Sequence, residues 1–339
     1  MSAPHELKLL RELSARLGAN PLLVQASTGN TSVKVNGVLW IKASGKWLTQ
    51  ADHDDFLVPV ELGAARSGDL TNVSSNGGSF NGGRCASIET AMHAVLPHAV
   101  VIHVHSVNVI AWAVRRDAER QLAVRLDGLR WQWIPYTPSG VPLAQRIEQA
   151  VFRARETNVL VLGNHGLVIC ADTCAAAEVL LAEVEERLRL EPRPTPGPAE
   201  TPLLPAAPEA AWYLPRCSRV SALATDPHSR KILAGGVLYP CQAIFLPGTT
   251  PARDGTWTYG NHSGKQPFFL VEEQGVRISR HVTRAEFEIL NGLAEVVQRI
   301  DSAAKLRYLE ETEVRSVLDE GASSYRRTAD PDYASAAAN

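Results

Sequence analysis

Two histidines interrupt the most apolar stretch of this chain in a pattern that suits a metal ion. His103 and His105 flank Val104 within residues 99–105, whose β-branched side chains indicate a buried strand. Side chains two positions apart on a strand point to the same face, so both imidazoles could reach one ion, whereas a helix would set them about 200° apart. The alternative interpretation is a pair of buried histidines that satisfy their nitrogens with hydrogen bonds in the core.

A third ligand has to come from elsewhere in the chain, because two histidines rarely complete a metal site. His165 lies between Asn164 and Gly166, in a turn where glycine lets the backbone approach closely and hold a side chain at the end of a sheet. We therefore interpret His103, His105 and His165 as ligands of a catalytic ion, since three protein ligands leave one coordination position open. Zn²⁺ is the expected ion, although imidazole also binds Mn²⁺, Co²⁺ or Fe²⁺.

A carboxylate and another histidine precede the strand on a predicted helix. Ser87 is a suitable N-cap for a helix over residues 88–96, which Pro97 ends. Glu89 then falls in the first turn, with His93 one turn later on the same face. A carboxylate beside a metal-bound carbonyl compound can remove an α-proton, because the ion lowers the pKa of that proton and stabilises the enediolate. The alternative for Glu89 is a helix-dipole partner, and His93 is expected to stay outside the ligand set.

The elements expected around these residues indicate an α/β domain. Leucines recur on one face of a predicted helix over residues 6–17, and the Asn36-Gly37 pair predicts a β-hairpin over residues 31–41. Residues 159–171 are expected to form a strand, a tight turn and a second strand, followed by a helix over residues 173–190. We therefore predict a three-layer α/β/α sandwich around a mixed, partly antiparallel central sheet.

Proline recurs every few residues after that helix and indicates a domain boundary, because such a stretch cannot continue a helix. Beyond it, residues 243–246 and 268–272 are expected to be strands and residues 284–300 a helix. The predicted segments are a metal-binding domain (residues 1–190), a proline-rich linker (191–210), a smaller α/β region of unknown role (211–320) and a loose tail (321–339).

Composition excludes several kinds of partner. The 339 residues carry a formal net charge of −2 with acids and bases interspersed, so no basic surface is available for nucleic-acid phosphates or a membrane. The longest apolar run is far shorter than the roughly 20 residues of a membrane-spanning helix, and the N-terminal residues lack the pattern of a secretory signal. Five cysteines without CxxC spacing do not indicate a disulfide framework. We expect a cytoplasmic protein.

The order of these motifs resembles that of the class II aldolase and adducin family over about residues 7–190. The motifs are Gly29-Asn30-Thr31-Ser32, Ser44-Gly45, Ser87-x-Glu89, His103-x-His105 and Asn164-His165-Gly166. The resemblance implies zinc on the three histidines, with Glu89 as the acid/base that also shields the empty metal. It further implies a phosphate site, which agrees with the free N–H groups that glycine-opened loops and a helix N-terminus offer an anion. The residues implied for that site are Gly29, Asn30, Ser44, Gly45 and Ser87.

The activity that this resemblance implies is that of a lyase acting on a small sugar. The bond between C3 and C4 of a ketose or ketose phosphate would break and leave an enediolate stabilised by zinc. The alternatives are a decarboxylase, a dehydratase or a 4-epimerase for a sugar acid or sugar phosphate, and a non-catalytic scaffold like the adducin head. The scaffold is disfavoured because the three histidines and the glutamate are all present. The resemblance also implies a homo-oligomer, a tetramer with sites at subunit contacts.

The sequence departs from the family pattern near the predicted phosphate site. Ile88 stands where the phosphate-binding aldolases usually carry a second serine, and Lys46 could add a charge to the site. A glycine-rich stretch ends at Arg84, which could instead receive a substrate carboxylate. Neither Tyr136 nor Tyr213 is assigned by a motif as the proton-donating tyrosine of the family.

Overall fold

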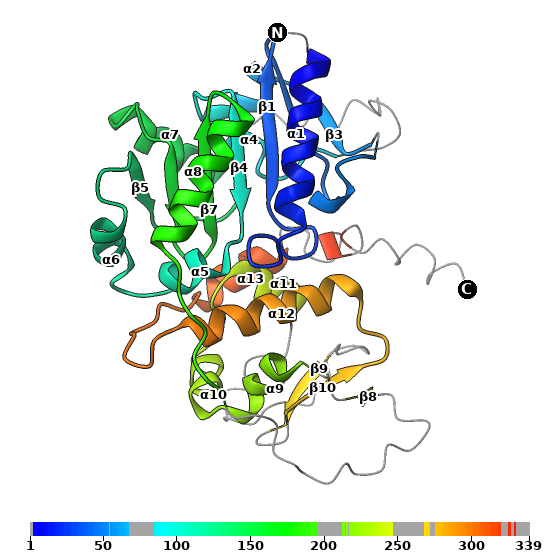
Figure 1. Cartoon of the computed structure of the whole chain (residues 1–339), viewed down its shortest axis with the longest axis vertical. Helices are drawn as coiled ribbons and strands as arrows, with labels where there is room; N and C mark the ends of the chain where they lie inside the picture. The colour runs from blue at the N-terminus through cyan, green and yellow to red at the C-terminus, as the bar shows by residue number, and fades with distance from the viewer. Residues whose placement is uncertain are drawn as a thin grey trace. The chain divides into compact units, whose positions relative to one another are not determined.

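The computed structural model divides the chain into two compact units (Figure 1). The first unit contains Met1–Ala113 and Asp117–Arg189, and the second contains Val114–Arg116 and Leu190–Asn339. The residues that the structure describes are 3–53, 55–67, 85–195, 212–213, 215, 217–246, 268–271, 275–319, 325–326 and 329. The glycine-rich stretch with Arg84, most of the proline-rich segment and most of the predicted tail therefore lie outside the described residues.

A seven-stranded sheet forms the centre of the first unit, in the order β3-β2-β1-β4-β7-β6-β5. The strands are β1 (Asn30–Val35), β2 (Val38–Lys42), β3 (Leu57–Glu61), β4 (Val100–Val104), β5 (Trp131–Ile134), β6 (Val159–Leu162) and β7 (Gly166–Ala171). β5 and β6 are parallel, and the other neighbours in this sheet are antiparallel. Asn36 and Gly37 form the predicted hairpin turn, with φ of 52° and 78°.

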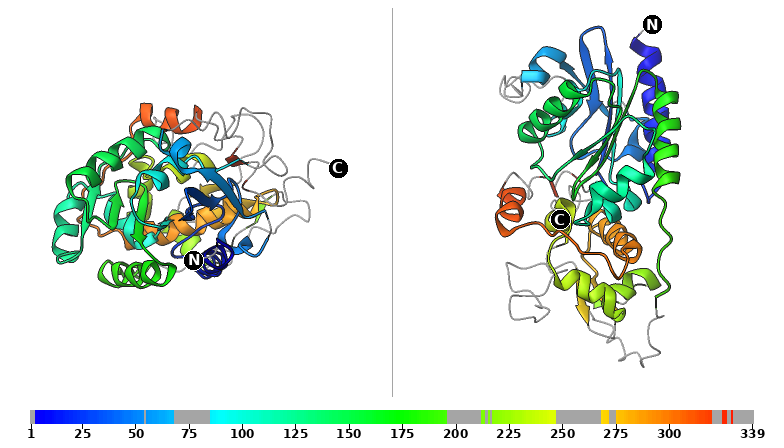
Figure 2. Two further views of the ribbon diagram at one scale, coloured as in Figure 1. Left: turned by 90° about the horizontal axis from the view of Figure 1, so that it is seen from above. Right: turned by 90° about the vertical axis from the view of Figure 1, so that its left-hand side faces the viewer.

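Helices cover both faces of this sheet (Figure 2, right). α1 and α8 lie on one face, where α1 packs on β1 and α8 packs on β4 and β7, whereas α2, α4 and α7 lie on the other. The predicted three-layer sandwich with a mixed sheet is therefore confirmed. The helices are α1 (Ala3–Gly18), η1 (Leu48–Gln50), α2 (Leu62–Ser67), α4 (Thr90–Val95), α5 (Val107–Ala113), α6 (Ala118–Arg125), α7 (Val141–Arg153) and α8 (Cys174–Arg187).

The buried residues of the first unit agree with the apolar patterns of its sequence. Leu10 and Leu13 of α1 are fully buried against the sheet, as the helical spacing of its leucines predicts. β4 is buried along its whole length, because it lies in the middle of the sheet with helices on both faces. A strand buried on both faces has a continuous apolar run instead of alternating polar and apolar residues.

The second unit combines helices with a small antiparallel sheet in the order β8-β10-β9. α12 packs against α9, α10 and α11, and β10 packs against α9. A capping box between Thr283 and Glu286 begins α12, whose prediction is confirmed. The elements are β8 (Trp212–Tyr213), α9 (Ser218–Thr225), α10 (Pro227–Ala234), α11 (Pro240–Phe245), β9 (Phe268–Val271), β10 (Gly275–Ser279), α12 (Arg284–Arg299) and α13 (Glu311–Asp319).

The strand predicted over residues 243–246 is wrong, because this run lies in α11 and at its end. A four-residue apolar run fits a buried helix as well as it fits a strand. The decisive signal is Pro240, which stands at the start of the helix, where a missing N–H costs nothing.

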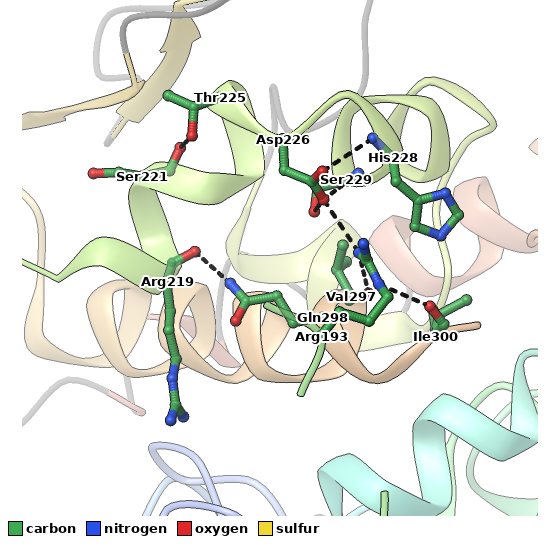
Figure 3. Close-up of polar contacts among 10 residues, drawn as sticks. All are labelled: Arg193, Arg219, Ser221, Thr225, Asp226, His228, Ser229, Val297, Gln298 and Ile300. Atoms are coloured by element: carbon green, nitrogen blue, oxygen red, sulfur yellow. Dashed lines mark hydrogen bonds and ion pairs between the residues drawn. The ribbon is translucent and has the colours of Figure 1, made fainter. Parts of the chain in front are cut away.

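Polar contacts fix the beginning of the proline-rich segment on the second unit (Figure 3). Arg193 donates through Nε to the carbonyl oxygen of Ile300 (3.2 Å) and through Nη2 to the carboxylate of Asp226 (3.2 Å). The same carboxylate accepts hydrogen bonds from the backbone N–H (3.0 Å) and hydroxyl (2.6 Å) of Ser229, which cap α10. None of the helices in the described part of the chain is both long and apolar enough to span a membrane.

Replacing Gly18, at the end of α1, with alanine tests how tightly the helix packs there. Helix propensity alone would make alanine stabilising, whereas the packing predicts a loss of stability. A Cβ at this position would lie 2.5 Å from the backbone nitrogen of Thr49 and 2.7 Å from the carbonyl carbon of Leu48. We expect Gly18→Ala to lower the free energy of unfolding by about 1–3 kcal/mol, because the backbone of η1 must move. Urea unfolding measures this change, and a variant as stable as the wild type would contradict the tight contact.

Candidate metal centre

Three imidazoles converge at one end of β4. His103 is the fourth residue of β4, His105 follows the end of that strand, and His165 lies in the turn between β6 and β7. One ligand nitrogen from each histidine lies within 4.8 Å of the other two. The ring centroids are 4.9, 5.0 and 5.2 Å apart with the rings nearly perpendicular, so the nitrogens meet edge to edge around a common centre.

The turn that carries His165 depends on close backbone packing. Asn164 has φ of 52°, and the N–H of His165 donates to the carbonyl oxygen of Leu162 (3.2 Å). A Cβ on Gly166 would lie 2.6 Å from the carbonyl oxygen of Val104. Glycine is therefore required where β7 starts against the end of β4, and this contact places His165 beside the other two histidines.

A hydrogen bond fixes the tautomer of His103. Its Nδ1 lies 3.0 Å from the carbonyl oxygen of Leu167, which can only accept, so Nδ1 carries the proton. The lone pair is then on Nε2, which faces Nε2 of His105 at 3.1 Å. This is the arrangement in which a backbone carbonyl orients a metal-binding imidazole.

Burial keeps these imidazoles in the form that binds metals. It lowers the pKa of His103, and together with the neighbouring imidazoles it lowers the pKa of His105 well below the ordinary value. Both side chains are therefore neutral at physiological pH. A neutral imidazole offers a lone pair to a cation, whereas an imidazolium does not.

Glu89 completes the cluster. Its Oε1 lies 3.4 Å from Nε2 of His103 and 3.3 Å from Nε2 of His165. Burial raises the pKa of this carboxyl, but the charge that an adjacent histidine carries when protonated lowers it more strongly, so the pKa lies well below the ordinary value. Oε1 is buried and has no hydrogen-bond partner among the described residues.

The prediction that Ser87 caps a helix starting at residue 88 is wrong. α4 begins at Thr90, with Glu89 at the preceding cap position. The hydroxyl of Ser87 accepts from the N–H of Glu89 (3.2 Å), and its carbonyl oxygen accepts from the N–H of Thr90 (3.0 Å). Ser87 thus forms a turn before the helix, and this turn aims Glu89 at the histidines.

The cluster fits a divalent cation. Nε2 of His103 and Oε1 of Glu89 are both acceptors, and they face each other at 3.4 Å away from water. Either a proton or a metal ion between them would remove this repulsion, but burial opposes protonation of His103. A cation bound by the lone pairs of His103, His105 and His165 would satisfy all of these atoms.

Asn30, predicted to bind phosphate, lies beside this cluster and contacts Glu89 directly. Its Nδ2 donates to Oε2 of Glu89 (2.7 Å) and to the hydroxyl of Ser87 (3.3 Å). Asn30 is paired with His103 across β1 and β4, which explains its position. The predicted residues Asn30, Ser87 and Glu89 are thus brought together.

The two glycine loops have structural roles of their own. Gly29 has φ of 66°, and a Cβ there would lie 2.7 Å from the carbonyl oxygen of His103, so this loop packs directly on β4. Gly45 has φ of 76°, and the N–H of Ser44 donates to the carbonyl oxygen of Cys85 (2.9 Å). Lys46 forms an ion pair with Asp55.

Lys42 is a residue that the sequence reasoning missed. Its buried Nζ donates to the carbonyl oxygens of Ser27 (2.8 Å) and Lys46 (2.6 Å), so it joins the two glycine loops. Burial lowers the pKa of Lys42 to about 7, although the charge of Glu89 acts in the opposite direction. The available signal was a lysine between Ile41 and Ala43 directly before Ser44-Gly45, in a strand that is otherwise apolar at this end.

His93 contacts β1 through the side chain of Ser32. Its Nδ1 lies 2.7 Å from the hydroxyl of Ser32, and it is not part of the metal-binding cluster found among the described residues. Burial lowers the pKa of His93 to about 3. The side chain is therefore neutral.

His93 should make the stability of the metal-free protein depend on pH. In the unfolded chain it titrates near the ordinary pKa of 6.5, so the unfolded state binds more protons and stability falls as the pH drops from 6.5 towards 3. We expect His93→Gln to reduce this slope by up to about 1.4 kcal/mol per pH unit. Urea unfolding between about pH 5 and 6.5, with a chelator present, measures the slope. Parallel profiles for variant and wild type would contradict a neutral, buried His93.

Comparison with known proteins places these features in a family. The model of the class II aldolase and adducin N-terminal domain matches residues 9–191. The chain is 26% identical over 174 residues to the uncharacterized oxidoreductase YuxG of Bacillus subtilis strain 168, a match that covers 46% of this chain. The chain spans only 25% of the length of that relative.

Solved structures with a similar domain include two aldolase-type proteins. The N-terminal class II aldolase domain of a conserved protein from Thermoplasma acidophilum is 23% identical, with 56% of this chain and 94% of that chain covered and a TM-score of 0.48. L-fuculose-1-phosphate aldolase from Thermus thermophilus is 20% identical, with 55% and 93% covered and a TM-score of 0.39. Because the family model spans more than half of the sequence, this chain belongs to the class II aldolase and adducin family.

Proposed function

We propose that this protein is a zinc-dependent lyase that cleaves a ketose or ketose phosphate. The observation that supports it best is the convergence of three buried imidazoles, two of which face Oε1 of Glu89. His103, His105 and His165 would hold the ion, and the close approach of their nitrogens supports this assignment. A zinc ion bound there would polarise the substrate carbonyl and stabilise the enediolate left by bond cleavage.

Glu89 is the proposed acid/base. It is deprotonated because its pKa is low, and Asn30 holds Oε2 so that Oε1 faces the histidines. In the cleavage direction, the proton of the C4 hydroxyl moves to Oε1 as the C3–C4 bond breaks. The electrons of that bond move towards the carbonyl, giving an aldehyde and an enediolate, and the proton is then returned to C3 of the enediolate.

The alternative activities reuse the same residues. A decarboxylase, a dehydratase or a 4-epimerase would also form an enediolate from a sugar acid or sugar phosphate. A non-catalytic scaffold accounts less well for the site, because burying three histidines and a carboxylate costs stability that a bound cation would recover. We assign no oxidoreductase activity to this chain from its similarity to YuxG, because the match spans only a quarter of that protein.

The remaining functional expectations follow from the family resemblance. The substrate is a small molecule, and the protein is proposed to form a homo-oligomer, a tetramer like those of the family. A cytoplasmic location agrees with the sequence pattern. Gly29, Ser44 and Gly45 are proposed to contact the substrate from the loops that Lys42 joins.

Elemental mass spectrometry of the purified protein tests the proposal. We expect near-stoichiometric zinc that is lost in a His103→Ala, His105→Ala double variant, because that variant keeps only one ligand of the cluster. Screening of ketoses, ketose phosphates and sugar acids with the zinc-loaded protein then separates aldol cleavage from the alternatives. Absence of any divalent metal, even after reconstitution, would contradict the mechanism and favour the scaffold.

Glu89→Gln should separate metal binding from turnover. The amide cannot accept the substrate proton, so we expect kcat to fall by about 10²- to 10⁴-fold while zinc stays bound to the histidines. Steady-state kinetics and metal content on the same sample measure both effects. Glu178→Gln on α8, which removes an exposed carboxylate paired with Arg16, is the control and should leave both unchanged. Full activity in Glu89→Gln would exclude the proposed role.

A further inference from the structure

The amide of Asn30 has a fixed orientation. Its Nδ2 donates to Oε2 of Glu89 at 2.7 Å and to the hydroxyl of Ser87 at 3.3 Å. The reverse orientation would place the amide oxygen against a carboxylate, so two acceptors would face each other. The nitrogen of Asn30 is therefore committed to Glu89, and the oxygen points elsewhere.

That oxygen is an acceptor without a donor. Asn30 is 3% exposed, and its Oδ1 is buried without a hydrogen-bond partner in the described part of the chain. Buried polar atoms in native proteins are almost always paired, so Oδ1 is available to a donor that a bound molecule brings. A hydroxyl can donate to Oδ1, whereas an ionised phosphate oxygen can only accept.

The groups around Asn30 also offer little to a phosphate. Both N–H donors of its amide are already directed at Glu89 and Ser87, so neither is left for a phosphate oxygen. The two nearby lysines already have partners, since Lys42 donates to two carbonyl oxygens and Lys46 pairs with Asp55. Ile88, next to Glu89, is 50% exposed and has no polar group to offer.

We infer that Asn30 binds a hydroxyl of the substrate and that a phosphate is disfavoured at this position. The inference rests on the proposed function and narrows its substrate class to sugars or sugar acids with a free hydroxyl beside the reacting carbons. Asn30 thereby has two roles: it orients Glu89 through its nitrogen and selects the substrate through its oxygen.

Three hydroxamates test this selection on the zinc-loaded, full-length protein. A hydroxamate chelates a divalent ion through two adjacent oxygens, as an enediolate would. Acetohydroxamate lacks the hydroxyl, glycolohydroxamate carries it, and phosphoglycolohydroxamate replaces it with a phosphate ester. Isothermal titration calorimetry should give about tenfold tighter binding for glycolohydroxamate than for acetohydroxamate, the size of one net hydrogen bond. The phosphate ester should bind no more tightly than glycolohydroxamate.

The outcomes separate this inference from the proposed function. Tenfold tighter binding of the phosphate ester than of glycolohydroxamate, or equal binding of glycolohydroxamate and acetohydroxamate, would overturn the hydroxyl site and leave the metal site intact. Binding of none of the three would contradict the proposed metal site and, with it, the inference.

A variant locates the effect at Asn30. In Asn30→Ala the preference for glycolohydroxamate over acetohydroxamate should disappear, while binding of acetohydroxamate and zinc content persist. Asn158→Ala is the matched control, because Asn158 precedes β6 at the end opposite to the turn that carries His165. The control should keep the tenfold preference. A preference that survives in Asn30→Ala would show that another residue binds the hydroxyl and would overturn the assignment.

Discussion

The repulsion between Nε2 of His103 and Oε1 of Glu89 is the constraint on which the candidate site depends. Both atoms carry lone pairs, they lie 3.4 Å apart, and the surrounding side chains exclude water. The proton of His103 is committed to the carbonyl oxygen of Leu167, and burial opposes a second proton. A cation between the two atoms would remove this repulsion, and the same cation would supply the proposed chemistry.

The strands in the middle of the central sheet position these atoms. β4 lies between β1 and β7, so Asn30 and the turn at His165 reach His103 from opposite sides. Gly29 and Gly166 allow the neighbouring backbones to approach β4 within distances that a Cβ would forbid. The histidine positions are thus set by backbone packing, which is more rigid than a flexible loop would be.

Particular residues show how far sequence reasoning reached. The His-x-His spacing, the Asn36-Gly37 turn and the leucines of α1 follow local rules of periodicity and turn chemistry, so the three-layer fold and the cluster of histidines could be predicted. Lys42 could not be placed, because its role depends on two carbonyl oxygens from separate loops. Asn30 was recognised, but the direction of its amide is set by Glu89, which is 59 residues away in sequence.

X-ray absorption spectroscopy at the zinc edge of the zinc-loaded protein tests the central claim most directly. Three imidazole nitrogens should appear at about 2.0–2.1 Å, with the remaining ligands oxygen, and one nitrogen should be lost in His165→Ala. A shell that contains sulfur at about 2.3 Å, or only oxygen ligands, would contradict the site.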